Sequence, residues 1–464
     1  MTPAGQRRWP WLLALLLAAI AVVRVLAADN DLWLDEIWTL EQIRSLHSAL
    51  GVFTELQQEN HALYTLWAYL CGPEVSGGLY RLPAVGSGLI TVAVAGWIAV
   101  RQSGARVAAP FAVGLVGFSY LSVHFGSEAR GYAPSTALAL LAFAALLHGI
   151  DRPQRRWRVL FGTALCLALV AQPIAIDLLA AAAVWIPVHR LRRAVGVRRA
   201  LVESAGWLAL PVAFFAANYL VYLRHLQTGG GAEHTLAEVG GNAIAYTFGL
   251  PVALGSAGLI ALGAVVVLAG LATLVRERDD LCVFYLAGGV AAPLALLWLR
   301  GSALIYERYF VLSATLVLLS TSHLLTRLWQ RAPRPLAALL LAAFVTGSGS
   351  QALPLLRYGR GDVSGLLRRV AAATATAEIR YSANHPFRVP MVIDHHAPRA
   401  LPGRTLRYVG PNDRPDWVIK SLLDPGTDLD RAVTSPDGET FRLVLVVPSA
   451  PLSGFWWAAY RREG

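Results

Sequence analysis

The sequence predicts an all-α polytopic membrane domain of about 11 transmembrane helices, followed by a small extracytoplasmic α/β domain. Of its 464 residues, 56% are hydrophobic and 15% are charged, and the mean hydropathy is +0.50. A chain this apolar over most of its length is excluded as a soluble domain, so the bilayer must be its solvent. Apolar stretches of roughly 20 residues, enough to cross about 30 Å of hydrocarbon as helix, recur from Trp11 to Pro354.

The apolar pattern ends near residue 355, which predicts a transmembrane domain over residues 1–355 and a second domain over residues 356–464. The second part is mixed, rich in charge and Pro, and contains short β-like runs. These runs lie at Val389–Ile393, Trp417–Ser421 and Phe441–Val447. They predict a small α/β domain.

Eleven stretches are expected to cross the bilayer. They are residues 11–28, 79–100, 107–124, 132–150, 159–172, 174–188, 201–222, 251–275, 281–299, 305–326 and 336–354. The short loops on the side of the N-terminus hold most of the arginine, and this places the N-terminus in the cytoplasm. These loops are residues 101–106, 151–158, 189–199, 276–280 and 327–334. An odd number of crossings exports the C-terminal domain, which predicts a multi-pass inner-membrane protein.

The formal charge of +11 is therefore read as a topology signal, with basic loops at an anionic leaflet and no nucleic-acid partner. The first stretch, Trp11 to Ala28 after Arg7 and Arg8, has the form of a signal peptide. It contains Arg24 near its far end and leads into an acidic, Trp-rich loop, which favours a retained helix. The three cysteines are not expected to meet, so neither a disulfide nor a metal cluster is predicted.

Polar residues gather in three loops on the predicted outer side. The first loop, residues 29–78, opens with an acidic cluster between tryptophans and continues into a short apolar stretch, Leu63–Leu70, expected to lie at the interface as a helix. The acidic and following polar residues include Asp29, Asp31, Asp35, Glu36, Glu41, His61 and Tyr64. The second loop carries His124, Glu128 and Arg130, and the third carries Tyr306, Glu307, Arg308 and Tyr309.

This set of residue types suits transfer of a sugar from a phosphate-bearing lipid to a hydroxyl acceptor. The acceptor needs a carboxylate to remove its proton as the anomeric carbon is attacked, and Asp35 or Glu36 is the candidate. The leaving phosphate needs fixed positive charge, and arginine forks match phosphate oxygens. The candidates for the phosphate are Arg81, Arg130 and Arg308, with Arg24 a weaker fourth.

Each of these candidate residues also has an alternative explanation, in which its role is purely structural. In the structural alternative, Asp35 and Glu36 are only solvated charges at a helix end, although their place between tryptophans at an interface speaks against that. His61 would then cap the interfacial helix, and Glu128 with Arg130, or Glu307 with Arg308, would form ion pairs at the bilayer edge. Arg24 is expected to snorkel to the interface.

Five short motifs, in one order along the chain, resemble those of the GT-C superfamily of membrane glycosyltransferases. Residues 32–38, LWLDEIW, are similar to its Asp-Glu loop, and residues 60–64, NHALY, to its NHPPLY stretch. Residues 80–83, YRLP, resemble its LRLP, and residues 127–132, SEARGY, its SQEARxY. Residues 307–309, ERY, look like its PRY entrance to a later helix. The superfamily includes the protein O-mannosyltransferases of glycosyltransferase family 39 and the aminoarabinose transferases acting on lipid A.

The resemblance covers residues 10 to 355 and implies an inverting transfer from a polyprenyl-phosphate-linked sugar to an extracytoplasmic cell-envelope acceptor. It implies that Asp35 rather than Glu36 is the base, and it assigns the remaining polar motif residues to substrate binding. These are His61, Tyr64, Glu128 and Tyr306. Ala62 departs from a family proline, and Gln172-Pro173 stands where many relatives have a histidine, which leaves the donor and acceptor preference open.

A divalent metal is used by some relatives and not by others, and His61, Asp35 and Glu128 have suitable ligand types, but no metal or other cofactor is assigned. In the C-terminal domain, residues 394–396, DHH, are read as a polar turn in preference to a metal site. Trp456 and Trp457 are expected to pack the sheet in preference to stacking on sugar.

Two other functional classes are compatible with a polytopic chain. A transporter or flippase of a lipid-linked glycan should place ionisable residues near the bilayer midplane, where Asp177 is the main candidate. A scaffold or sugar-binding membrane protein would not need a base and phosphate-binding groups in three outward loops. The transferase is the reading that uses all three loops.

Overall fold

The computed structural model describes residues 9–56, 60–152, 154–226, 233–300, 304–410, 413–423 and 429–463. The chain forms two compact units. The helical unit comprises Met1–Ala28, Leu46–Cys71 and Tyr80–Ala352, and the sheet unit comprises Asp29–Ser45, Gly72–Leu79 and Leu353–Gly464. The first acidic loop, with Asp35 and Glu36, is thus part of the same compact unit as the C-terminal residues.

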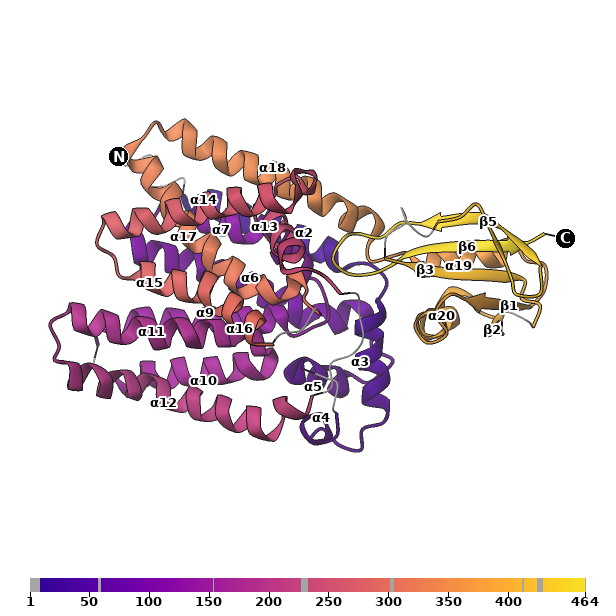
Figure 1. The fold of residues 1–464 in the computed structure, drawn as a ribbon, viewed down its shortest axis with the longest axis horizontal. Coiled ribbons are helices and arrows are strands. Elements are labelled where there is room, and N and C mark those ends of the chain that lie inside the picture. The colour runs from indigo at the N-terminus through magenta and orange to yellow at the C-terminus, as the bar shows by residue number, and fades with distance from the viewer. Residues whose placement is uncertain are drawn as a thin grey trace. The chain divides into compact units, whose positions relative to one another are not determined.

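Long apolar helices make up most of the helical unit (Figure 1). The helices of this unit that precede Gln172 are α2 (Trp9–Ala28), α4 (Gly51–Thr54), α5 (Ala62–Cys71), α6 (Gly77–Ser103), α7 (Ala108–Phe118), α8 (Tyr120–Phe125), α9 (Tyr132–Gly149) and α10 (Arg155–Ala171). Those that follow it are α11 (Ile176–Arg192), α12 (Val197–Val221), α13 (Leu236–Phe248), α14 (Gly255–Arg276), α15 (Leu281–Leu286), α16 (Ala292–Arg300), α17 (Val311–Arg331) and α18 (Arg334–Tyr358). Short 3₁₀ turns η1 (Pro173–Ala175) and η5 (Glu307–Phe310) precede α11 and α17, and a π-helical turn, η4 (Ala287–Ala291), joins α15 to α16.

Helices occupy all eleven predicted spans, which confirms the polytopic all-α class. Within the described ranges, nine helical stretches are long and apolar enough to cross a membrane. The two other expected spans differ for local reasons: α10 has 17 residues, and the span at 107–124 is divided into α7 and α8. Ser119 divides it, because its backbone (φ −49°, ψ 123°) leaves the helical region. The sequence did not predict α13.

The chain turns sharply between α10 and α11, as the sequence predicted. Gln172 is extended (φ −166°, ψ 131°), and Pro173 then begins η1. Proline has no N–H to donate and disfavours a helical conformation in the residue before it, so one helix ends and the next begins here.

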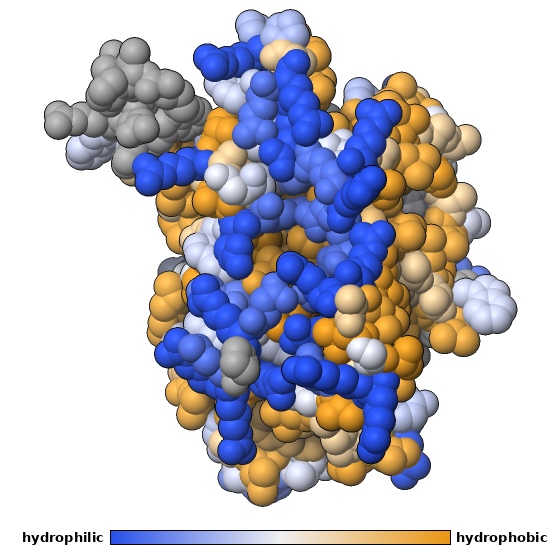
Figure 2. Space-filling model, turned by 90° about the vertical axis from the view of Figure 1, so that its left-hand side faces the viewer, coloured by the Kyte–Doolittle hydropathy of each residue, from blue (hydrophilic) through white to orange (hydrophobic). Residues whose placement is uncertain are grey.

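Arginine-rich loops meet at one end of the helical unit, where Figure 2 shows polar side chains gathered between apolar flanks. His189 joins two of these loops, with Nδ1 2.9 Å from an oxygen of Asp280 and Nε2 3.2 Å from an oxygen of Asp151. Arg327 Nε lies 2.8 Å from an oxygen of Glu277 in another pair of loops. These contacts place four of the five loops that the sequence assigned to one side of the membrane at one end of the bundle.

A six-stranded sheet forms the centre of the sheet unit, in the order β2-β1-β3-β6-β5-β4. The strands are β1 (Glu378–Ala383), β2 (Thr405–Tyr408), β3 (Trp417–Leu422), β4 (Ala432–Thr434), β5 (Thr440–Val447) and β6 (Trp456–Arg462). The first three pair in parallel, and the others are antiparallel. Helices α3 (Leu34–Arg44), α19 (Val363–Ala372) and α20 (Arg388–Ala400) complete the unit. The mixed sheet confirms the predicted α/β class.

The predicted strands at 417–421 and 441–447 are confirmed as β3 and β5, whereas the one at 389–393 is wrong. These residues lie in α20, whose buried residues Val389, Val392, Ile393 and His396 are spaced at i, i+3, i+4 and i+7. That spacing places one apolar stripe along a helix, which a short apolar run read alone does not reveal. The prediction of a polar turn at residues 394–396 is wrong for the same reason. Trp457, on β6, is buried in the core of the sheet unit, as expected.

Candidate active site

The carboxylate of Glu36 caps the N-terminus of α3 (Leu34–Arg44), the helix on which it lies. Trp33 is extended (φ −102°, ψ 175°) and precedes α3, and its backbone N–H donates to Oε2 of Glu36 at 3.2 Å. This contact satisfies one of the backbone donors that every helix N-terminus leaves without an intrahelical partner. Glu36 is fully buried in this arrangement, so its carboxylate has a structural role at the start of α3.

Asp35 lies one residue earlier, in the first turn of α3, where its side chain is partly exposed. The positive end of the helix dipole favours a carboxylate at this position. Arg388, at the start of α20, faces it: burial lowers the pKa of Arg388, and the negative charge of Asp35 opposes that shift. The two acidic neighbours thus have different surroundings, and Asp35 is the one that solvent reaches.

The segment before Asp35 is anchored on α19 and α20 within the sheet unit. Asp31 accepts hydrogen bonds from the backbone N–H of Ser364 at 2.7 Å and from its hydroxyl at 2.9 Å. Nε2 of the buried His396 donates to the carbonyl of Leu32 at 2.9 Å. Arg360, also buried, donates to Oδ1 of Asn30 at 3.3 Å. These contacts fix the backbone that leads into the first turn of α3.

In the helical unit, His61 and Arg130 come together from two of the three predicted outer loops. The backbone carbonyl of His61 accepts from Tyr64 and Thr65 and so begins α5, which confirms the short helix after it. Its imidazole Nε2 accepts a hydrogen bond from Nε of Arg130 at 2.9 Å. The other ring nitrogen, Nδ1, lies 3.2 Å from the amide nitrogen of Gly131. His61 therefore orients the Arg130 guanidinium.

Burial lowers the pKa of His61 well below its usual 6.5, and the positive charges of Arg130 and Arg308 lower it further, against a hydrogen bond to Ala171 that raises it. The neutral ring agrees with an Nε2 that accepts from Arg130. The pKa effect of Arg308 also shows that this arginine, from the third loop, lies near the pair.

The stability of the protein should fall on acidification because of His61. Its pKa is 6.5 when unfolded and well below that when folded, so the unfolded state binds more protons between these values. The stabilising contribution is fully present above 6.5 and is lost as pH falls towards the folded pKa. When the pH is lowered from 7 to 5, the thermal midpoint of His61→Asn should fall less than that of the wild type, with a difference on the order of 1–2 °C. Equal slopes in scanning fluorimetry of the two proteins would contradict this.

Glu128 and His124 lie behind Arg130 and are fully buried. Oε1 of Glu128 is 3.8 Å from Nη1 of Arg130, and Oε2 is 3.9 Å from Nε2 of His124. Arg130 also lies over the ring of Tyr132, 5.4 Å from its centre. The negative charge of Glu128 holds the guanidinium from one side while leaving 13% of the Arg130 side chain exposed.

Arg308 lies among aromatic rings in η5. Its guanidinium carbon is 4.3 Å from the ring centre of Tyr306 and 5.9 Å from that of Tyr309. Its neighbour Glu307 instead accepts a hydrogen bond from Asn242 of α13 at 3.0 Å. The two charged residues of this loop therefore have separate partners, and the ring of Tyr306 orients the guanidinium.

Tyr64 and Arg81 are buried, and each donates a hydrogen bond to a main-chain carbonyl. The Tyr64 hydroxyl donates to the carbonyl of Tyr80 at 2.6 Å, and Nη1 of Arg81 donates to the carbonyl of Ala28 at 2.9 Å. Both contacts join α6 to preceding segments of the helical unit. Substrate contact by either residue stays a prediction.

Arg24 does not snorkel. Its side chain is fully buried, and its two terminal nitrogens donate to the carbonyl and hydroxyl oxygens of Ser122 at 2.9 and 2.8 Å. Gly88 and Gly126 leave room for the Arg24 guanidinium, because neither has a side chain. A Cβ on Gly126 would lie 1.9 Å from Nη1 of Arg24. The arginine therefore joins α2 to α8.

An apolar cavity of about 350 Å³ opens beside Asn60, next in sequence to His61. Its walls come from the loop before α5 and from α10 and α12, and include Phe53, Leu169, Val170, Phe214 and Val221. A cavity of this size and character suits a hydrocarbon segment more than a sugar. Among the described residues, no three His, Cys, Asp or Glu side chains are grouped so that they could hold a metal ion.

Sequence reasoning missed the residues of the sheet unit that hold the Asp35 segment. Arg388, His396 and Arg360 lie more than 300 positions from it, and no local motif links them to the first loop. The only available indication was the DHH triplet at 394–396, whose last histidine is the one that contacts Leu32.

No protein-family model matches the sequence, and no curated protein matches it either. Two crystal structures of ArnT, an aminoarabinose transferase from Cupriavidus metallidurans, match the fold. The apo structure has a TM-score of 0.55 and the structure bound to undecaprenyl phosphate 0.53. In both cases the identity is 14%, and the match covers 97% of this chain and 98% of ArnT. The fold is therefore similar to that of ArnT over nearly the whole chain, as the resemblance of the sequence motifs led us to expect.

Proposed function

We propose that this chain, with the ArnT fold over 97% of its length, transfers a sugar from a polyprenyl-phosphate donor to an extracytoplasmic cell-envelope acceptor, with inversion. The observation that carries the proposal is the oriented pair of arginines near His61, with an apolar cavity beginning one residue away. Fixed positive charge beside an apolar cavity matches a ligand that is a phosphate at one end and an isoprenoid at the other.

Arg130 and Arg308 are assigned to the donor phosphate. Arg130 is held by His61 and Glu128, and Arg308 by the ring of Tyr306, so both guanidinium groups are oriented before any ligand arrives. Such preorganisation is what stabilises charge that develops on a leaving group. ArnT itself has been crystallised with undecaprenyl phosphate, which supports a ligand of this class here.

Asp35 is assigned as the general base. It takes the proton of the acceptor hydroxyl as the acceptor oxygen forms a bond to the anomeric carbon. The bond from that carbon to the phosphate oxygen breaks on the opposite face, so the configuration inverts and polyprenyl phosphate leaves. The partly exposed carboxylate of Asp35 is suited to this role, whereas that of Glu36 is engaged by Trp33.

The apolar cavity is assigned to the isoprenoid chain, which predicts a specific loss of lipid binding when it is filled. Ala217 of α12 lines the cavity, whereas its neighbour Ala216, which is exposed as Ala217 is, does not. Ala217→Trp should abolish most of the thermal stabilisation that undecaprenyl phosphate gives, while Ala216→Trp should keep it. Equal stabilisation of both variants would exclude this cavity as the lipid site.

The sidedness of the membrane protein follows from the arginine-rich end of the helical unit, which we assign to the cytoplasm with the N-terminus. The sheet unit would then be extracytoplasmic. Protease added to intact spheroplasts should remove epitopes placed after residue 463, and protection of such epitopes until lysis would reverse the assignment.

Transport of a lipid-linked glycan is the alternative, favoured by the burial of Asp177 in the first turn of α11. The two functions differ in their products. In proteoliposomes with a radiolabelled polyprenyl-phosphate sugar and envelope extract, a transferase releases polyprenyl phosphate. A flippase would move the intact donor to the other leaflet without breaking the sugar–phosphate bond, and that result would replace our proposal.

A further inference from the structure

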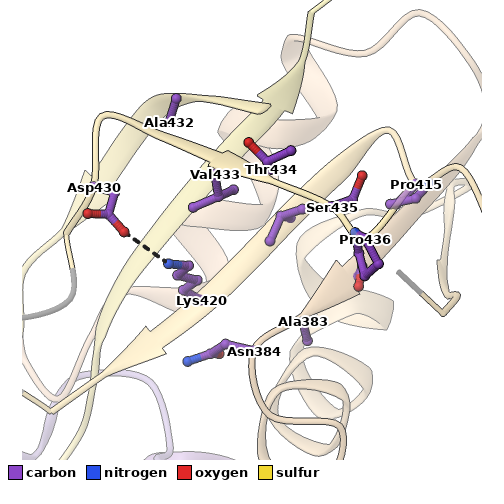
Figure 3. Close-up of a pocket in the computed structure, with 12 residues that line it drawn as sticks. Ala383, Asn384, Pro415, Lys420, Asp430, Ala432, Val433, Thr434, Ser435 and Pro436 are labelled. Carbon is purple, nitrogen blue, oxygen red and sulfur yellow. Dashed lines mark ion pairs between the residues drawn. The ribbon is translucent and has the colours of Figure 1, made fainter. Parts of the chain in front are cut away.

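The sheet unit contains an open polar cavity of about 450 Å³ that the proposed transfer chemistry does not use (Figure 3). It lies beside the end of β1 and along β3, and it is covered in part by β4 and the turn after it. Its polar lining consists of Ser382, Asn384, Lys420, Asp430, Thr434 and Ser435.

The position of this cavity follows from the strand order. β1 continues through α20 to β2 on one side and pairs with β3 on its other side. In open α/β sheets, ligands bind at such points, outside the carboxyl ends of the parallel strands. The side chain of Asn384 extends the β1–β3 pairing, because it donates to the carbonyl of Ser421 and accepts from its N–H, both at 3.0 Å.

The cavity lies on the face of the sheet that α19 and α20 do not cover. Successive residues of a strand point to opposite faces. Trp417 points towards the helices, since its indole donates to Thr374 just after α19 at 2.9 Å. Val418 and Lys420 therefore point the other way, into the cavity, as Figure 3 shows for Lys420.

Lys420 is the only lysine of the chain, in which lysine and arginine together number 40. Its side chain is 19% exposed, and its ammonium lies 3.9 Å from Oδ2 of Asp430 and 5.3 Å from the ring centre of Tyr460. Asp430 offsets its charge, so the lining combines donors and acceptors without a net charge. The carboxylate of Asp430 would repel an anionic ligand. A hydrocarbon would leave the polar groups of the lining without hydrogen-bond partners.

We propose that this cavity binds a neutral saccharide, whose many hydroxyls both donate and accept hydrogen bonds. The volume is within the range of small-molecule sites. If the proposed function holds, on which this step rests, the saccharide is part of the envelope acceptor, bound by the sheet unit apart from the donor.

The single lysine allows a direct test. Full-length protein in detergent is acetylated with a limiting amine reagent, and peptide mapping follows Lys420 separately from the N-terminal amine. The probe is a neutral oligosaccharide fraction from partial hydrolysis of the source cell envelope, compared with the acidic fraction of the same hydrolysate and with sorbitol. The neutral fraction should slow Lys420 acetylation at least threefold. Thr434→Trp, which fills the cavity, should abolish this protection, and Thr405→Trp on the exposed part of β2 should retain it.

No protection by the neutral fraction, protection by the acidic fraction alone, or protection that persists in Thr434→Trp would each overturn the saccharide site. No donor is present in this experiment. Its outcome is therefore independent of sugar transfer, which is measured by release of polyprenyl phosphate. A protein that protects Lys420 but releases no polyprenyl phosphate would keep the saccharide site and lose the transferase.

Discussion

Asp35→Asn should lower the turnover of the donor by about 10²- to 10⁴-fold while leaving the protein folded, because general-base catalysis contributes on that order. Asparagine has nearly the same size and shape but cannot take up the acceptor proton. Asp35 is partly exposed, and the carboxylate that accepts from the backbone N–H of Trp33 is that of Glu36, so the thermal midpoint should change little. Initial rates with saturating acceptor measure the effect.

Two matched variants separate the base from its acidic neighbours. Asp29→Asn makes the same chemical change at an exposed position of the same segment and should keep wild-type turnover. Glu36→Ala removes the acceptor of the Trp33 N–H and should cost about 1 kcal/mol of stability, whereas Glu36→Gln keeps an oxygen there and should retain most turnover. Loss of turnover in a folded Glu36→Gln protein, with Asp35→Asn active, would move the base to Glu36.

Arg308→Ala should weaken binding of undecaprenyl phosphate by about 10- to 100-fold, since hydrogen bonds to charged groups contribute about 1.5–3 kcal/mol. Arg130→Ala should have a similar effect. Lysine at either position keeps the charge but loses the planar fork, so Arg308→Lys should recover only part of the affinity. The concentration dependence of thermal stabilisation by undecaprenyl phosphate measures these affinities.

The control for both arginines is Arg198→Ala, which removes one positive charge from the exposed first turn of α12 at the arginine-rich end. Its affinity for undecaprenyl phosphate should equal that of the wild type. If Arg198→Ala weakened binding as much as Arg308→Ala, the effect would be one of net charge, and neither Arg130 nor Arg308 could be assigned to the phosphate.

The helices of the transmembrane part were predictable because their physical requirement is simple. Each span needs about 20 apolar residues, and the basic loops mark one side, so composition alone locates them. The break at Ser119 and the extra helix α13 were not predictable in this way. They depend on backbone conformation and on packing in the bundle, which a hydropathy pattern does not contain.

The candidate site was predictable only in part. Local motifs pointed to Asp35, His61 and Arg130, and the structure brings His61 and Arg130 into contact. The residues that support them could not be found from the sequence: Arg388 and His396 are distant in the chain, and Arg24 was expected at the interface. The burial of Arg24 depends on two glycines from other segments that leave it space, and such a tertiary effect has no local signature.

The central claim is tested most directly by release of polyprenyl phosphate from a panel of polyprenyl-phosphate sugars, with envelope extract as acceptor, by the wild type and by Asp35→Asn. We predict that the wild type turns over one donor and that the folded Asp35→Asn protein does not, although it still binds undecaprenyl phosphate. Equal turnover by the two proteins would contradict the assignment of Asp35 as the base.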